Sequence, residues 1–129
     1  MLIKIRAGGF CHTDLMALNN EFDSPLPYIG SHEPAGIIEE VGSDVKNFKK
    51  GDRVGAIAFD SPCGKCPDCK TGRIKFCDAP KMMKGITGDG GWAEYMVSDA
   101  KTCVAIPDSV PFEQAAGEIN SNMSLRGGY

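Results

Sequence analysis

The alternation of apolar and polar residues at the start of the chain predicts a β-strand. Ile3 and Ile5 alternate with Lys4 and Arg6, which is the period of a strand with one buried face. Segments with the composition and length of strands recur farther along the chain. They cover residues 36–41, 53–57, 93–97 and 102–106.

Two short helices are predicted in addition to these strands. One follows Thr13, and the other covers residues 111–116, with Pro111 in its first turn and Ser109 as its cap. Short strands with few crossover helices favour an antiparallel barrel over a doubly wound sheet. The predicted fold class is therefore mainly β, a β-rich α+β domain.

The length and charge of the chain restrict its class. Its 129 residues predict one domain, and a net charge of -3 with both signs interspersed makes nucleic acid a poor partner. The apolar run at the amino terminus is too short for a signal peptide, and no apolar stretch is long enough to span a membrane. We therefore expect a cytoplasmic protein with no membrane partner.

Four closely spaced cysteines predict a metal site. Cys63, Cys66 and Cys69 are three residues apart, and Cys77 follows after seven intervening residues. Each short span can bring two sulfur atoms to one side of a tight turn. A zinc ion with four protein ligands has no open position, so the lobe over residues 63–77 is predicted to hold structural zinc.

Other interpretations of these cysteines fit less well. A thioredoxin-type pair at Cys63 and Cys66 would leave Cys69 and Cys77 unexplained. A ferredoxin cluster needs a shorter last gap followed by proline, and haem attachment needs histidine directly after the second cysteine. Disulfides need an oxidising compartment. Zinc ligation therefore remains the preferred interpretation.

Two further clusters bring reactive side chains together. Residues 11–14 are Cys11, His12, Thr13 and Asp14, and residues 32–33 are His32 and Glu33. Each cluster alone is a weak signal, since a cysteine at a strand end is usually a small core residue. Their joint occurrence before the cysteine lobe gives them weight.

Six ordered motifs together resemble the zinc-dependent alcohol dehydrogenases of the medium-chain dehydrogenase/reductase family. They are residues 9–14, 30–36, 42–45, 51–54, the four-cysteine lobe and residues 90–95. The likeness is to the amino-terminal catalytic domain, whose fold is GroES-like, and it implies a partly open β-barrel with a zinc lobe.

The resemblance also implies domain limits. It covers residues 1–116 and implies a catalytic domain that is incomplete at its amino terminus, because family members begin some thirty residues earlier. Residues 117–129 diverge from the family and are largely polar, so we expect a disordered tail there.

By the same resemblance, several residues have expected roles. Cys11 and His32 lie where the family binds its catalytic zinc, and Glu33 is an acid close enough to reach that metal. Asp14 would orient a zinc ligand. Thr13 would pass the alcohol proton outward, and His12 would contact the pyrophosphate of NAD or NADP.

The chain also departs from the family pattern. Asn120 stands about where the family has its third zinc-binding cysteine, and Met16 stands where many relatives have a relay histidine. The one spare thiol, Cys103, is expected to be a buried small apolar residue. Residues 88–93 fit a G-x-G-x-x-A pattern, but a strand is predicted next, so we expect a structural turn rather than a phosphate loop.

These observations lead to two hypotheses. The first is a fragment of a zinc alcohol dehydrogenase that, at full length, oxidises a small alcohol to a carbonyl compound with NAD or NADP. We expect the isolated chain to be inactive and to hold a catalytic zinc weakly or not at all. The alternative is a non-catalytic zinc-binding GroES-like interaction module. The sequence leaves the substrate and the oligomeric state open.

Overall fold

The computed structural model describes residues 1–79 and 82–125. Five strands form one antiparallel sheet in the order β6-β1-β2-β3-β7, and β4 and β5 form a small second sheet. The strands are β1 (Leu2–Gly8), β2 (Pro34–Glu40), β3 (Arg53–Ala56), β4 (Phe59–Asp60), β5 (Met82–Met83), β6 (Tyr95–Val97) and β7 (Cys103–Ala105).

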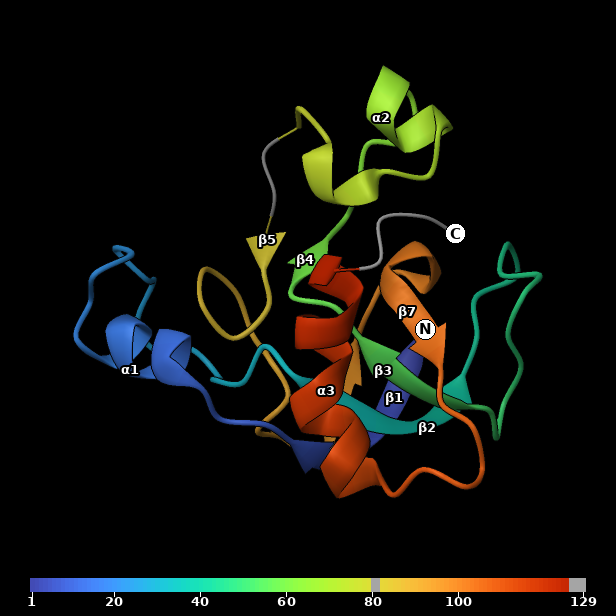
Figure 1. Ribbon diagram of the computed structural model, residues 1–129, viewed down its shortest axis with the longest axis horizontal. Helices are drawn as coiled ribbons and strands as arrows, with labels where there is room; N and C mark the ends of the chain where they lie inside the picture. Colours follow the sequence, from blue (N-terminus) through green and yellow to red (C-terminus); the bar gives the residue numbers. More distant parts are fainter. Residues whose placement is uncertain (80–81, 126–129) are drawn as a thin grey trace.

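The helices lie around this sheet. They are α1 (His12–Leu18), α2 (Pro67–Lys70) and α3 (Phe112–Leu125), with short 3-10 helices η1 (Ile74–Phe76) and η2 (Ala100–Thr102). Figure 1 shows α3 lying across β1, β2 and β3, and α2 with its flanking loops projecting from one end of the molecule. The projecting part contains the four closely spaced cysteines.

The predicted strands are confirmed, and the sheet that they form is open. All five predicted strands occur within a few residues of their expected limits. The sheet does not close into a barrel, because β6 and β7 are its two outer strands. Val97 on β6 is 71% exposed. The mainly β class is therefore correct, and the barrel is only partial.

The core has two parts, one on each face of the sheet. Ile3, Ile38 and Val54 are buried together on one face. Ala35 and Ile106 are buried on the opposite face beneath α3. Successive residues of a strand point to opposite faces, so the strand alternation places Ile38 and Ala35 on different sides. Both faces of the central strands are therefore covered.

The carboxyl-terminal helix is longer than predicted. α3 continues to residue 125, whereas the sequence predicted a helix over residues 111–116 followed by a disordered segment. Residues 126–129 lie outside the described part of the chain.

The length of α3 has a physical cause. Ala115 and Ala116 pack against Ala35 and Ile106, which anchors the first turns of the helix. An anchored helix adds each further residue at a small cost, because the costly nucleus has already formed. The polar composition of the following residues therefore did not end the helix.

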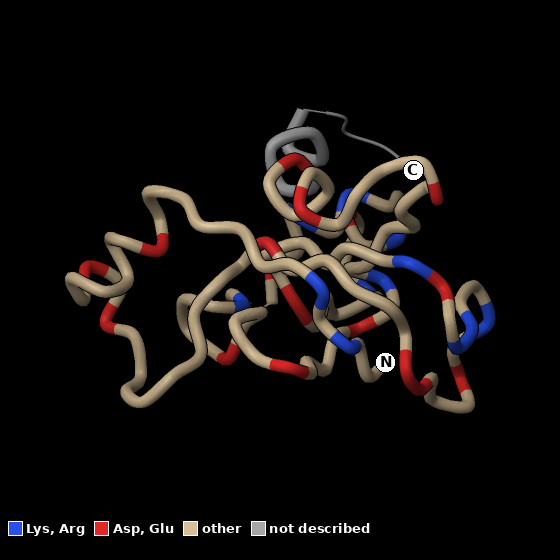
Figure 2. Tube along the Cα trace, turned by 90° about the horizontal axis from the view of Figure 1, so that it is seen from below, with Lys and Arg blue, Asp and Glu red and all other residues tan. Residues whose placement is uncertain are grey.

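The distribution of charged residues and the character of the helices can be compared with the sequence. Figure 2 shows only acidic residues along the segment that projects to the left, and residues of both signs along the remainder of the described chain. Among the described residues, no helix has both the length and the apolar character needed to cross a membrane.

Gly36→Ala is expected to destabilise the chain by about 1–3 kcal/mol, which is the usual cost of overpacking a core. A Cβ atom at Gly36 would lie 2.3 Å from the Lys4 carbonyl oxygen and 2.9 Å from Ile3 Cγ2, so β1 and β2 would have to separate. Urea unfolding measures the loss. Gly42→Ala is the control, because no atom of the described residues lies within 4 Å of its added Cβ. Equal midpoints for the two variants would contradict the prediction.

Candidate functional site

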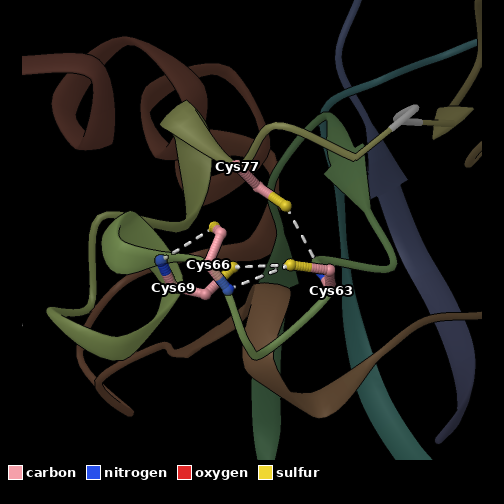
Figure 3. A group of neighbouring side chains, drawn as sticks. All are labelled: Cys63, Cys66, Cys69 and Cys77. Atoms are coloured by element: carbon pink, nitrogen blue, oxygen red, sulfur yellow. Dashed lines mark hydrogen bonds between the residues drawn. The ribbon is translucent and has the colours of Figure 1, made fainter.

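The four cysteines of the projecting lobe converge. Figure 3 shows the side chains of Cys63, Cys66, Cys69 and Cys77 facing one another, and their sulfur atoms all lie within 4.8 Å of one another. The sulfur atoms of Cys63 and Cys69 are 3.9 Å apart. Thiolates around tetrahedral zinc at about 2.3 Å are about 3.8 Å from each other. The donor set and its spacing therefore fit a closed zinc site.

Tight local turns bring these sulfur atoms together. Gly64 has a φ of 71°, a left-handed conformation that glycine adopts without steric cost. Cys66 caps α2 by accepting a hydrogen bond from the Cys69 N–H, and Pro67 occupies the first helical position, which is favourable for proline. A tight turn at Gly64 and the start of α2 therefore lie between these cysteines.

Backbone N–H groups favour the charged form of three of the thiols. Hydrogen bonds from the backbone N–H groups of Lys65, Cys69 and Cys63 lower the pKa values of Cys63, Cys66 and Cys77 respectively. Burial instead raises the pKa of Cys69 to about 12. Metal ligation requires thiolates, so the lobe already stabilises three of the four anions that a zinc ion would bind.

A buried ion pair lies where the chain enters and leaves the cysteine lobe. Asp60 ends β4, which leads into the lobe, and Lys84 follows β5, which leads out of it. The Nζ atom of Lys84 lies 3.3 Å from Asp60 Oδ1 and 3.1 Å from the Ile57 carbonyl oxygen. Asp60 Oδ1 also accepts hydrogen bonds from the Asp99 N–H and the Thr102 hydroxyl. Burial lowers the pKa of Lys84, and the charge of Asp60 opposes this shift.

A second cluster forms where the start of α1 meets the start of β2. The sulfur atom of Cys11 lies 3.3 Å from His32 Nε2, and Glu33 Oε1 lies 3.8 Å from the same nitrogen. The donor atoms of Cys11, His32 and Glu33 all lie within 4.8 Å of one another. Sulfur and nitrogen ligands on one tetrahedral zinc ion are about 3.6 Å apart. The cluster thus has three donors at metal-binding distances.

Asp14 lies within hydrogen-bonding distance of the histidine in this cluster. Its Oδ1 atom lies 3.2 Å from His32 Nδ1, and its Oδ2 atom accepts a hydrogen bond of 2.8 Å from the Cys11 N–H. A carboxylate at Nδ1 favours a proton there and leaves the Nε2 lone pair toward Cys11 and Glu33. Burial raises the pKa of Glu33, and the charge of the Asp14 carboxylate also raises it.

The structure therefore brings together four of the six residues predicted for this cluster, namely Cys11, Asp14, His32 and Glu33. Thr13 lies on the first turn of α1, where its N–H donates to the Cys11 sulfur atom at 3.3 Å. His12 is exposed at the start of the same helix. The functional roles predicted for Thr13 and His12 remain predictions.

Two predictions for residues outside the two clusters are confirmed. Cys103 is buried in the core with Ile3 and Val54, as expected for a small apolar residue. Residues 88–93 are followed by strand β6 rather than by a helix. They form a turn against the loop that precedes His32, since the Gly90 and Gly91 N–H groups donate to the Ile29 and Ser31 carbonyl oxygens.

Sequence patterns did not indicate a role for some residues near the clusters. Lys84 and Asp60 look like ordinary surface residues, because each is a charged residue directly after an apolar run and the two lie far apart in the chain. Ser31 precedes His32 but carries no chemical signature of its own. A buried role for these residues depends on contacts between distant segments, which local patterns do not report.

The chain matches a known protein family over most of its length. Residues 1–108 match the family described as the alcohol dehydrogenase GroES-like domain. An alcohol dehydrogenase from Geobacillus stearothermophilus is 43% identical over 118 residues, which cover 90% of this chain and 35% of that protein.

Solved structures give the same result. A cinnamyl alcohol dehydrogenase from Sorghum bicolor matches with a TM-score of 0.82 and 31% identity, over 96% of this chain and 39% of that one. A putative zinc-binding dehydrogenase from Sinorhizobium meliloti, bound to NADP, matches with a TM-score of 0.76 and 37% identity, over 90% and 33%. The chain thus spans about a third of the length of the curated relatives that it matches.

Proposed function

Because this chain belongs to the alcohol dehydrogenase GroES-like domain family, we propose that residues 1–116 form the catalytic, zinc-binding domain of an alcohol dehydrogenase that uses NAD or NADP. The substrate class is a small alcohol or its carbonyl product. The names of the relatives support this class. The observation that carries the proposal is the cluster of Cys11, His32 and Glu33, with Asp14 hydrogen-bonded behind the histidine.

The two clusters are proposed to hold zinc in different ways. The four cysteines would hold a structural ion tightly. Cys11 and His32 would be the strong ligands of the catalytic ion, and Glu33 a third and weaker one. When bound, zinc supplies a Lewis acid that makes an alcohol hydroxyl easier to deprotonate. We expect the second ion to be held less tightly, because it has only two strong protein ligands.

The remaining residues of the cluster are proposed to bind and to move protons. Asp14 would keep His32 Nε2 free of a proton and aligned toward Cys11. Thr13 would accept the proton that leaves the alcohol, and the exposed His12 would contact the cofactor pyrophosphate. Met16 cannot relay a proton, so the proton would leave Thr13 by another route.

Cobalt titration of the purified chain tests the proposal. Cobalt(II) replaces zinc in such sites and gives a visible spectrum that depends on its ligands. We expect two cobalt ions per chain, the first bound more tightly than the second in competition with a chelator. Cys11→Ala is expected to abolish the second ion and keep the first, because it removes one of only two strong ligands.

A matched control and the contrary outcomes complete this experiment. Cys103→Ala also removes a thiol, but from the core rather than from either cluster, so it should keep both ions. Loss of the second ion in Cys103→Ala, or its retention in Cys11→Ala, would contradict the proposed ligands. Binding of a single ion by the unaltered chain would contradict the proposed second metal site.

A further inference from the structure

Ser31 has an unusual backbone conformation next to a proposed metal ligand. Its φ is 70°, in the left-handed region that non-glycine residues seldom adopt. It is fully buried and directly precedes His32. A strained residue at such a position persists only when its surroundings fix it, and such residues concentrate at functional sites.

The side chain of Ser31 connects the two segments that carry the second cluster. Its hydroxyl donates a hydrogen bond of 2.9 Å to the Gly9 carbonyl oxygen, two residues before Cys11. The Gly9 N–H donates in turn to the Glu33 carbonyl oxygen at 3.0 Å. Both backbone polar groups of Gly9, its carbonyl oxygen and its N–H, are therefore hydrogen-bonded to the segment that carries His32 and Glu33.

The backbone of Ser31 is enclosed by the turn over residues 85–91. The Gly91 N–H donates to the Ser31 carbonyl oxygen at 2.8 Å. A Cβ atom at Gly85 would lie 2.3 Å from the Ser31 carbonyl carbon, and one at Gly90 would lie 2.2 Å from the Ser31 oxygen. These close approaches leave Ser31 little room to change conformation, so its hydroxyl is held toward Gly9.

The result is a cluster whose donors are already close together. Cys11 Sγ and His32 Nε2 are 3.3 Å apart, near the value of about 3.6 Å that a shared zinc ion would give. The two segments are 21 residues apart in the chain. Fixing their separation in advance lowers the cost of ordering them when a ligand binds.

We propose that Ser31 is a positioning residue for the metal site of Cys11, His32 and Glu33, and that its hydroxyl holds the Cys11 segment at metal-binding distance from His32. This inference rests on the proposed function of that cluster. Ser31 is not proposed as a metal ligand. It acts through the Gly9 carbonyl and through the backbone of the neighbouring histidine.

Two substitutions distinguish the effect of the Ser31 hydroxyl from the effect of its backbone conformation. Ser31→Ala removes the hydroxyl and keeps the strained φ, whereas Ser31→Gly removes the hydroxyl and suits that φ. We expect both variants to bind cobalt at the second site about five- to tenfold more weakly, as for the loss of one neutral hydrogen bond. We also expect the Gly variant to melt at a higher temperature than the Ala variant.

The experiment measures cobalt affinity by chelator competition and stability by thermal unfolding of the full 129-residue chain. The four-cysteine site serves as an internal control, and its affinity should not change. Ser43→Ala is the matched variant, because it removes an exposed serine hydroxyl far from Gly9 in the sequence. It should leave both affinities unchanged.

Each contrary outcome has a distinct meaning. Wild-type affinity in Ser31→Ala, or wild-type affinity restored by Ser31→Gly, would overturn the role of the hydroxyl, because affinity would then follow stability alone. Absence of a second cobalt site in the unaltered chain would overturn the proposed metal centre and the Ser31 assignment together.

Discussion

Cys66→Ser is expected to leave the cysteine lobe without zinc. Serine keeps the approximate shape of cysteine, but a hydroxyl is a far poorer zinc ligand than a thiolate at neutral pH. Cys66 also accepts the hydrogen bond that caps α2, so the substitution changes the lobe at its turn. Elemental analysis of the purified variant should show close to one zinc ion fewer per chain than the unaltered protein.

A second measurement reports the structural consequence. A lobe without metal is expected to be cleaved rapidly by protease within residues 63–77, because four sulfur atoms facing one another provide little apolar packing. Lys65→Ser is the matched control, since it changes an exposed residue of the same turn and should keep both the zinc and the resistance to protease. Full zinc occupancy in Cys66→Ser would disprove the assignment of the lobe.

Lys84→Met is expected to lower the free energy of unfolding by about 3 kcal/mol or more, the usual cost of removing one partner of a buried ion pair. The lysine side chain has no exposed surface, and its loss would leave the Asp60 carboxylate buried without its counterion. Because Asp60 and Lys84 connect the lobe to the sheet, we also expect zinc to leave the lobe faster. Urea unfolding and transfer of zinc to a chelator measure the two effects.

An exposed ion pair provides the control for this variant. Lys50 Nζ lies 2.6 Å from Glu39 Oε1 on the surface, and pairs of this kind contribute little to stability. Lys50→Met should therefore unfold at nearly the same urea concentration as the unaltered chain. Adding Asp60→Asn to Lys84→Met should recover part of the loss, because it removes the uncompensated charge. Equal stability of Lys84→Met and Lys50→Met would show that the buried pair is not needed.

The strands were predictable because their signal is local. Apolar alternation in β1 and the composition of β2 and β3 depend on residues adjacent in the sequence. The convergence of the cysteine lobe was predictable for the same reason, since short spans fix where the sulfur atoms can lie. The length of α3 was not, because its anchoring alanines pack against residues from β2 and from the segment after β7.

The second cluster was only partly accessible from the sequence. Cys11 and His32 are 21 residues apart, and only the resemblance to a known family indicated that they would meet. The structure supports their proximity independently, through the contacts of Asp14 with both segments. Ser31 could not be identified in this way, because its conformation is imposed by a turn more than fifty residues later in the chain.

The outer strand β6 leaves one edge of the sheet open. Among the described residues it pairs with β1 alone, and its Val97 side chain is exposed. Unpaired strand edges of this kind promote self-association, and many proteins protect them with lysine. We therefore expect this edge to promote self-association at high concentration and Val97→Lys to reduce it.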